Sequence, residues 1–241
     1  MTTASTPVDL ADAGPVAGLV PARFIKRVNR FAALVELGAR ETLVHVANSG
    51  RMHELLVEGN VCWLRPAPGD HRKTAYDLAL VDIGHTLVSA DARLPNHLVH
   101  RAFQEGRLTQ FAACDESHTE VVYGESRLDL ALRGPSGTCF IETKSVTLVE
   151  DGAGLFPDAP TTRGRKHMLS LMHAVEEGHR AAVVFVIQRD DAQFFRPHDA
   201  ADPDLGQALR QAVSAGVEAY AYTCTVSLEE VRLAEPLQVM L

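Results

Sequence analysis

The sequence predicts an all-β N-terminal domain followed by an α/β C-terminal domain. Between residues 23 and 89, short β-like stretches alternate with turn residues. Beyond residue 92, apolar residues at helical spacing alternate with strand-like runs, which is typical of an α/β domain. With 241 residues the chain exceeds the usual length of one domain, roughly 100 to 200 residues, so length alone leaves one large or two small domains open.

The predicted β domain covers residues 21–91 and follows an N-terminal tail, residues 1–20, that we expect to be flexible and uncleaved. Several strands in so short a stretch suit a small barrel, and the five-stranded OB-fold is one option among several. Phe24, Phe31 and Trp63 are candidates for stacking on bases, although in a small barrel an aromatic side chain is more often part of the core. The predicted strands cover residues 31–37, 42–47, 61–64 and 75–81.

The predicted α/β domain covers residues 92–241. It begins with a short helix after Pro95, because Leu98, Val99 and Ala102 follow at helical spacing. In the helix expected over residues 161–178, the predicted buried stripe is Leu169, Leu171, Met172 and Val175. The other predicted elements are strands over 118–123, 126–133, 138–148, 180–188 and 217–227 and a helix over 204–215.

The charge balance limits how the chain can bind nucleic acid. A formal net charge of −8 opposes nonspecific attraction to a phosphate backbone, so binding must use local basic patches. Two patches stand out, and both also fit ordinary solvated surfaces. They are Arg23, Lys26, Arg27 and Arg30 near the start, and Arg163, Arg165, Lys166 and His167 later.

Other classes of protein find little support in the sequence. No apolar run approaches the roughly 18 to 20 residues that a membrane-spanning helix needs. The four cysteines are far apart and fit reduced thiols in the cytoplasm, and the eleven histidines show no zinc-site spacing. Nucleotide-binding glycine loops and a hydrolase serine elbow are also missing, which argues against a small-molecule enzyme.

One β-hairpin carries the clearest chemistry. Two strand patterns flank residues 134–137, Gly-Pro-Ser-Gly, a composition that should fold them antiparallel. Counting outward from this loop pairs Arg133 with Thr138 and places Asp129 opposite Glu142. Because side chains alternate along a strand, Asp129 should share one face with Glu142 and Lys144. The opposite face should carry Leu128, Leu130, Leu132, Cys139 and Ile141.

Two carboxylates at this separation repel each other unless a cation or a proton lies between them. A hard divalent metal such as Mg²⁺ removes the conflict, because it takes oxygen ligands and accepts water or phosphate in its remaining positions. Lys144 could then hold the attacking water or offset charge that develops on phosphorus. The competing interpretation is a surface hairpin in which Asp129 and Glu142 pair with Lys144 and Arg127.

Longer strings make the pattern more specific. From about Arg23 to the C-terminus the chain resembles the bacterial sugar fermentation stimulation protein A (SfsA) family. The matching strings are KRVNRF at residues 26–31, NSGRM at 48–52, YGESRLD at 123–129, IETKSVTL at 141–148, and FPDA at 156–159 followed by RGRKH at 163–167.

The resemblance implies an N-terminal OB-like barrel and a C-terminal domain similar to PD-(D/E)xK nucleases, with a mixed sheet flanked by helices. It puts Asp129, Glu142 and Lys144 in the D…E-x-K positions, with Mg²⁺ or Mn²⁺ on the two carboxylates. One departure is His100-Arg101, at a place in the helix after Pro95 where the family pattern has an acid. Glu120 is the candidate substitute ligand.

Two functions therefore stay open. One is a metal-dependent nuclease acting on DNA or RNA, and the other is a non-catalytic DNA-binding regulator of sugar (maltose-type) metabolism that keeps a nuclease fold. We expect a cytoplasmic protein that does not bind membranes, and a homodimer is one option for its assembly. The candidate nucleic-acid contacts are Arg23, Lys26, Arg27, Arg30, Arg51, Arg127, Arg163, Arg165 and Lys166.

Overall fold

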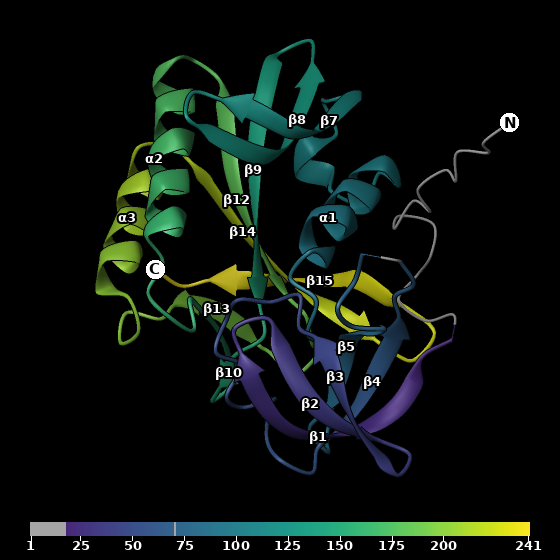
Figure 1. Cartoon of the computed structure of the whole chain (residues 1–241). Helices are drawn as coiled ribbons and strands as arrows, with labels where there is room; N and C mark the ends of the chain where they lie inside the picture. Colours follow the sequence, from purple (N-terminus) through teal and green to yellow (C-terminus); the bar gives the residue numbers. More distant parts are fainter. Residues whose placement is uncertain (1–17, 70) are drawn as a thin grey trace, which may run out of the picture.

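The computed structural model describes residues 18–69 and 71–241, and most of the N-terminal tail expected over residues 1–20 lies outside this range. Within it, the N-terminal sheet has six strands in the order β3-β2-β1-β4-β5-β6. A parallel contact between β3 and β5 closes the first five strands into a barrel, which confirms the OB-like fold (Figure 1). The strands are β1 (Val20–Asn29), β2 (Ala32–Leu37), β3 (Arg40–His45), β4 (Val61–Pro66), β5 (Tyr76–Asp82) and β6 (Leu87–Ser89).

The aromatic side chains of the barrel take three different positions. Phe24 is 2% exposed and packs in the barrel core, which is the more common of the two roles considered for it, and it is not available to stack on bases. Trp63 is partly buried and packs against the core of the C-terminal sheet. Phe31 is 49% exposed beside the turn between β1 and β2. Among these three residues, Phe31 is the most exposed to solvent.

The C-terminal sheet is mixed and flanked by helices, as predicted. Its nine strands in the described chain run β10-β11-β13-β15-β14-β12-β9-β8-β7. Helices α2 and α3 cover one face and α1 covers the other (Figure 1). The elements are α1 (Leu94–Gln104), a 3₁₀ turn (Thr109–Phe111), β7 (Glu116–Tyr123), β8 (Ser126–Gly134), β9 (Gly137–Val146), β10 (Val149–Glu150), β11 (Ala153–Phe156), α2 (Thr162–Glu176), β12 (Arg180–Ile187), β13 (Phe194–Pro197), α3 (Pro203–Ser214), β14 (Glu218–Val226) and β15 (Val231–Val239).

Helix α2 buries most of the predicted stripe: Leu171 lies in the core, and Met172 and Val175 are partly buried against it, but Leu169 is not buried. Leu169 is 54% exposed, whereas Met168 and Leu171 pack in the core that α2 and α3 share with the sheet. The face of α2 that packs on the sheet is therefore shifted by about one residue toward the N-terminus from the predicted face. The buried residues are Gly164, His167, Met168, Leu171 and Ala174.

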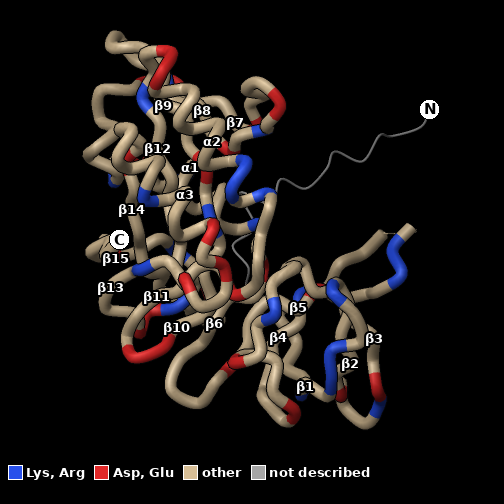
Figure 2. The backbone as a smooth tube through the Cα atoms, turned by 90° about the vertical axis from the view of Figure 1, so that its left-hand side faces the viewer, with Lys and Arg blue, Asp and Glu red and all other residues tan. Residues whose placement is uncertain are grey.

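Several contacts hold the barrel against the larger sheet. The Ser89 backbone N–H donates to the Gln188 carbonyl oxygen over 3.0 Å, at the end of β12. The Ala92 N–H donates to the Ala47 carbonyl, also over 3.0 Å, where the chain passes from one sheet to the other. Figure 2 shows the barrel as a second lobe beside the larger sheet, with acidic and basic residues interspersed on both. Loops of the barrel therefore stay near the ends of the C-terminal strands.

No helix within residues 18–69 and 71–241 is long and apolar enough to cross a membrane. All four cysteines lie in this range and are unpaired; Cys62, Cys139 and Cys224 are buried.

Candidate metal and phosphodiester site

The hairpin that carries the predicted centre forms with the expected register over most of its length. Strands β8 and β9 pair Arg133 with Thr138 and continue to Leu130 opposite Ile141. The ladder stops there, so Asp129 is not paired with Glu142 as predicted. Instead, Asp129 Oδ2 accepts hydrogen bonds from the Thr143 N–H and the Thr143 hydroxyl, both over 2.7 Å. The carboxylate thus turns toward the residue between Glu142 and Lys144.

An irregularity in the neighbouring strand accompanies this turn. Glu120 on β7 has a positive φ of 56°, which is uncommon for a residue other than glycine, and the Glu120–Asp129 pair is missing from an otherwise continuous register. Leu128 packs in the core beneath α2, whereas Leu130 packs in the core beneath α1. The prediction that Leu128 and Leu130 share a face was therefore wrong, because regular alternation breaks at Asp129.

Glu142 has one satisfied and one open carboxylate oxygen. The side chain is buried at 3% exposure, and Oε1 accepts a hydrogen bond from Lys144 Nζ over 2.6 Å and another from His167 Nδ1. Oε2 is also buried, but it has no hydrogen-bond partner among the described residues. A buried carboxylate oxygen without a partner is costly, so this atom is a strong candidate for a ligand contact.

His167 is a part of this centre that sequence reasoning missed. It was counted with the basic patch before the helix, but it is 4% exposed and points from α2 at Glu142 and Lys144. Arg163, one turn earlier, donates from Nε to His167 Nε2 over 3.3 Å. The four-residue spacing between Arg163 and His167 was the available signal, because such residues are neighbours on one helix face.

The two carboxyl groups have opposite electrostatic environments. Burial alone would raise the pKa of Glu142, but the positive charge of Lys144 and the hydrogen bonds from His167 and Lys144 outweigh it and lower that pKa. Burial, followed by repulsion from Glu142, raises the pKa of Asp129, although hydrogen bonds from Thr143 and the charge of Lys144 oppose this. The surroundings thus favour the ionised form of Glu142 and disfavour that of Asp129.

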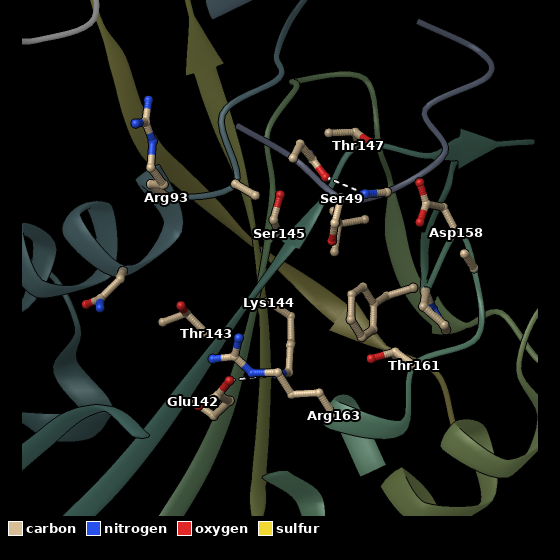
Figure 3. Close-up of a pocket in the computed structure, with 18 of the residues that line it drawn as sticks. Ser49, Arg93, Glu142, Thr143, Lys144, Ser145, Thr147, Asp158, Thr161 and Arg163 are labelled. Atoms are coloured by element: carbon tan, nitrogen blue, oxygen red, sulfur yellow. Dashed lines mark hydrogen bonds and ion pairs between the residues drawn. The ribbon is translucent and has the colours of Figure 1, made fainter. Parts of the chain in front are cut away.

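The predicted catalytic residues line one cleft of about 860 Å³ between the barrel and the C-terminal sheet. Asp129, Glu142 and Lys144 all contribute to it. In Figure 3, Arg163 reaches toward Glu142 and Lys144, while Ser49 and Asp158 lie across the cleft from them. The structure thus brings together the three side chains that the sequence placed on one strand pair.

The candidate third ligand is less well placed. Glu120 lines the same cleft, but its carboxylate is bound by Arg127 Nε over 2.7 Å and approached by Asn96 Nδ2 at 3.4 Å. In the part of the chain that the structure describes, no group of three or more His, Cys, Asp or Glu side chains is arranged to hold a metal. Any cation here must therefore take other ligands besides Asp129 and Glu142.

Helix α1 contributes polar residues rather than an acid to the cleft. Asn96 and His97 line it. His100, which stands where an acid was expected, makes a 2.8 Å hydrogen bond with Ser117, and Arg101 pairs with Glu105, the residue that follows the helix. Neither His100 nor Arg101 is among the residues that line the cleft.

The predicted nucleic-acid contacts fall into distinct groups. Arg30 and Arg163 are exposed and line the cleft, whereas Arg27 donates to backbone carbonyls of the barrel loops. Arg127, Arg165 and Lys166 pair with Glu120, Asp204 and Glu125 respectively. The remaining three, Arg23, Lys26 and Arg51, are exposed on the barrel but lie outside the cleft lining.

Comparison with known proteins gives a consistent result. Residues 25–90 match the family model described as the SfsA N-terminal OB domain, and residues 93–230 match the sugar fermentation stimulation protein RE domain. A sugar fermentation stimulation protein homolog from Desulforamulus reducens is 48% identical over 223 residues, covering 92% of this chain and 93% of the relative. A homolog of the same description from Caldanaerobacter subterraneus is 44% identical over 223 residues, covering 92% of this chain and 97% of its own.

A solved structure is similar over nearly the whole chain. The structure of Pyrococcus furiosus SfsA in complex with Ca²⁺ superimposes with a TM-score of 0.88 at 31% sequence identity. The match covers 94% of this chain and 98% of that one.

Proposed function

The chain belongs to the sugar fermentation stimulation protein family, and from that membership and the geometry of its cleft we propose that it binds nucleic acid and hydrolyses phosphodiester bonds with a divalent metal ion. The observation that carries the proposal is the buried, unpartnered Oε2 of Glu142 in the same cleft as Asp129. Two hard oxygen donors beside a lysine suit phosphate chemistry better than chemistry on an apolar substrate.

The donors present fit a divalent cation. Asp129 and Glu142 would hold it, and the charge of the ion would offset the burial and the repulsion from Glu142 that raise the pKa of Asp129. Mg²⁺ commonly uses one or two carboxylates and completes its shell with water and substrate phosphate, so the lack of a third protein acid is compatible with it. The Ca²⁺ in the related structure supports a divalent ion, and we propose Mg²⁺ or Mn²⁺. Such an ion would lower the pKa of a bound water and so favour formation of the attacking hydroxide.

The other residues of the centre have separate roles in this proposal. Lys144, buried at 8% exposure and bound to Glu142, would orient the attacking water and offset the negative charge of the phosphate as it reacts. Arg163 and Arg30, exposed at the cleft, would contact phosphates on either side of the reacting one. His167 touches Glu142 and not the cleft, so we assign it a positioning role.

A cleavage assay tests the proposal. Labelled single-stranded and duplex DNA and RNA are incubated with the protein in Mg²⁺, in Mn²⁺ and in EDTA, beside Glu142→Ala and the control Glu176→Ala, which changes an exposed acid of α2. We expect metal-dependent cleavage by the wild type and by Glu176→Ala, and none by Glu142→Ala. Intact nucleic acid in every lane, or equal cleavage by Glu142→Ala, would contradict the proposal.

A second function is favoured by one observation. Because the described residues hold no three-ligand metal group, the nuclease-like centre could serve only as a binding surface in a DNA-binding regulator. This alternative predicts binding that needs no metal, weakens steeply with salt and leaves the DNA intact. In either case the unpaired cysteines fit a reducing compartment, and we propose the cytoplasm.

A further inference from the structure

We propose that the cleft takes a single nucleic-acid strand, with a base stacked on Phe31 and the backbone passing between Arg30 and Arg163 toward Glu142. This inference rests on the proposed function and adds the class of substrate. It depends on three features of the described residues: the size of the cleft, the rigidity of its barrel wall, and the exposed Phe31 that follows the cleft-lining Arg30 in the chain.

The cleft has the size of a pocket for a few chemical groups. Its volume of about 860 Å³ lies within the range of roughly 300 to 1,000 Å³ found for sites that enclose a small ligand. Glu142 and Lys144 lie deep in it, at 3% and 8% exposure. A duplex presents its phosphates on the outside of a wide cylinder, so it suits reactive groups on an open surface. A single strand is narrow enough for one of its phosphates to enter the cleft between the barrel and the C-terminal sheet.

The barrel wall of the cleft is held in place by two anchors. Arg27 donates to carbonyl oxygens of Asn29 and Arg30 in the β1–β2 turn and of Asn48, Gly50 and Arg51 in the loop after β3. One guanidinium thus joins both loops.

The second anchor crosses to the other domain. Asp158, in the loop before α2, accepts a hydrogen bond from the Met52 N–H over 3.0 Å. A Cβ atom at Gly50 would lie 2.5 Å from Asp158 Oδ2, which shows how closely the two walls approach. The cleft therefore keeps its width unless these contacts break, and it is not a hinge that opens freely around a duplex.

The turn between β1 and β2, whose Arg30 lines the cleft, carries an exposed aromatic ring beside a cation, which suits an unpaired base and its phosphate. Phe31 is 49% exposed, and its backbone carbonyl, bound by the Val46 N–H over 2.9 Å, fixes it beside the loop after β3. Arg30, the preceding residue, is exposed and lines the cleft. Arg163 lies on the opposite wall, next to Glu142 (Figure 3). Proteins that bind single strands combine such stacking rings with cations, and in OB-folds the first inter-strand loop is a common binding element.

Fluorescence anisotropy tests the proposal without requiring turnover. Labelled single-stranded DNA and RNA of about 12 nucleotides, and a blunt duplex of the same sequence, are titrated with the full-length protein in Ca²⁺. The nucleic acid is checked afterwards on a gel. The variants are Phe31→Ala and Phe31→Trp, and the control is Val122→Ala, which removes a 75% exposed side chain on β7. Because Phe31 is exposed, its replacement should not destabilise the fold. Melting temperatures equal to that of the wild type would show that the variants are folded.

We expect at least one single strand to bind about tenfold or more tightly than the blunt duplex. Phe31→Ala should weaken single-strand binding by about tenfold, which is typical of losing one stacked base, while Phe31→Trp and Val122→Ala leave it unchanged. Duplex binding as tight as that of both single strands, or unchanged binding by Phe31→Ala, would overturn the proposal. Single-strand preference without cleavage would contradict only the hydrolytic function, whereas cleavage with duplex preference would contradict only the substrate class.

Discussion

Arg163 Nε lies 3.3 Å from His167 Nε2, and because a guanidinium can only donate hydrogen bonds, Nε2 must be the acceptor. The ring proton of neutral His167 is therefore on Nδ1, where it is donated to Glu142 Oε1. Lys144 occupies the same oxygen, so both donors hold Oε1 and leave Oε2 open. The orientation of Glu142 is thus set from helix α2.

Replacement of His167 should weaken the centre without unfolding the protein. His167→Ala removes the Nδ1–H donor, and the loss of such a supporting hydrogen bond typically costs about 10- to 100-fold in metal affinity or activity. His167→Asn, whose amide nitrogen can stand near the position of Nδ1, should retain more of both. Mn²⁺ affinity and cleavage rate are the measurements, with exposed His173→Ala on the same helix as the control. Equal losses in His167→Ala and His167→Asn would argue against a positioning role.

Substitutions of Glu142 and Lys144 should have strongly coupled effects on the free energy of unfolding. Glu142→Gln leaves the ammonium of Lys144 buried without its counter-charge, which should lower the free energy of unfolding by roughly 3 kcal/mol or more. In the double variant Glu142→Gln, Lys144→Met neither charge remains, and much of that loss should be recovered. Urea unfolding of the wild type, both single variants and the double variant measures the coupling. Simple additivity of the two single losses would contradict it.

The pH dependence of the free energy of unfolding should show that the surroundings of Asp129 disfavour its ionised carboxylate. Its pKa is raised in the folded protein by burial and then by repulsion from Glu142, so the folded state binds the proton more tightly. Its stabilising contribution is full below the ordinary value of 3.8 and is lost as pH rises through the folded-state pKa.

In EDTA at pH 7, Asp129→Asn should therefore be more stable than the wild type, by about 1 kcal/mol, the usual size of a single-substitution effect. The advantage should shrink as the pH is lowered toward 4. The asparagine carbonyl can still accept the bonds from Thr143. Urea unfolding at several pH values checks this. If Asp129→Asn were less stable than the wild type at pH 7, the prediction would be wrong, because other contacts would then outweigh the repulsion between Asp129 and Glu142.

Because Gly50 lies so close to Asp158, a larger residue at position 50 should destabilise the protein. Gly50→Ala places a methyl group against Asp158 Oδ2, which cannot move away without losing its bond to the Met52 N–H. We expect a loss of about 1 to 3 kcal/mol in the free energy of unfolding, as for other overpacked sites. In an Asp158→Ala background the same change should cost much less. A similar cost in both backgrounds would place the strain elsewhere.

The sequence predicted the central elements because their hydrophobic patterns are local. The hairpin register from Arg133 to Leu130 followed from its turn, and β12 and α3 appeared close to their predicted bounds. Strand β15 was not predicted, because Pro236 within it lacks an N–H for the ladder. The register shift between Tyr222 and Cys224 on β14 lies where Pro236 is accommodated.

The sequence predicted three residues of the candidate site, but not the backbone irregularity at Asp129 or the role of His167. Asp129, Glu142 and Lys144 meet in one cleft, as alternation along a hairpin suggested. The kink at Asp129 depends on a positive φ at Glu120 in the next strand, which no local pattern signals. The contribution of His167 depends on how α2 packs on the sheet, and a histidine within a basic string gives no indication of burial.

Titration calorimetry with Mn²⁺ tests the central claim most directly, using the wild type, Asp129→Ala and Lys144→Ala. The account predicts one site in the wild type, a site still present in Lys144→Ala, which loses only turnover, and no detectable site in Asp129→Ala. Unchanged Mn²⁺ affinity in Asp129→Ala would contradict the assignment of Asp129 and Glu142 as the metal-binding pair.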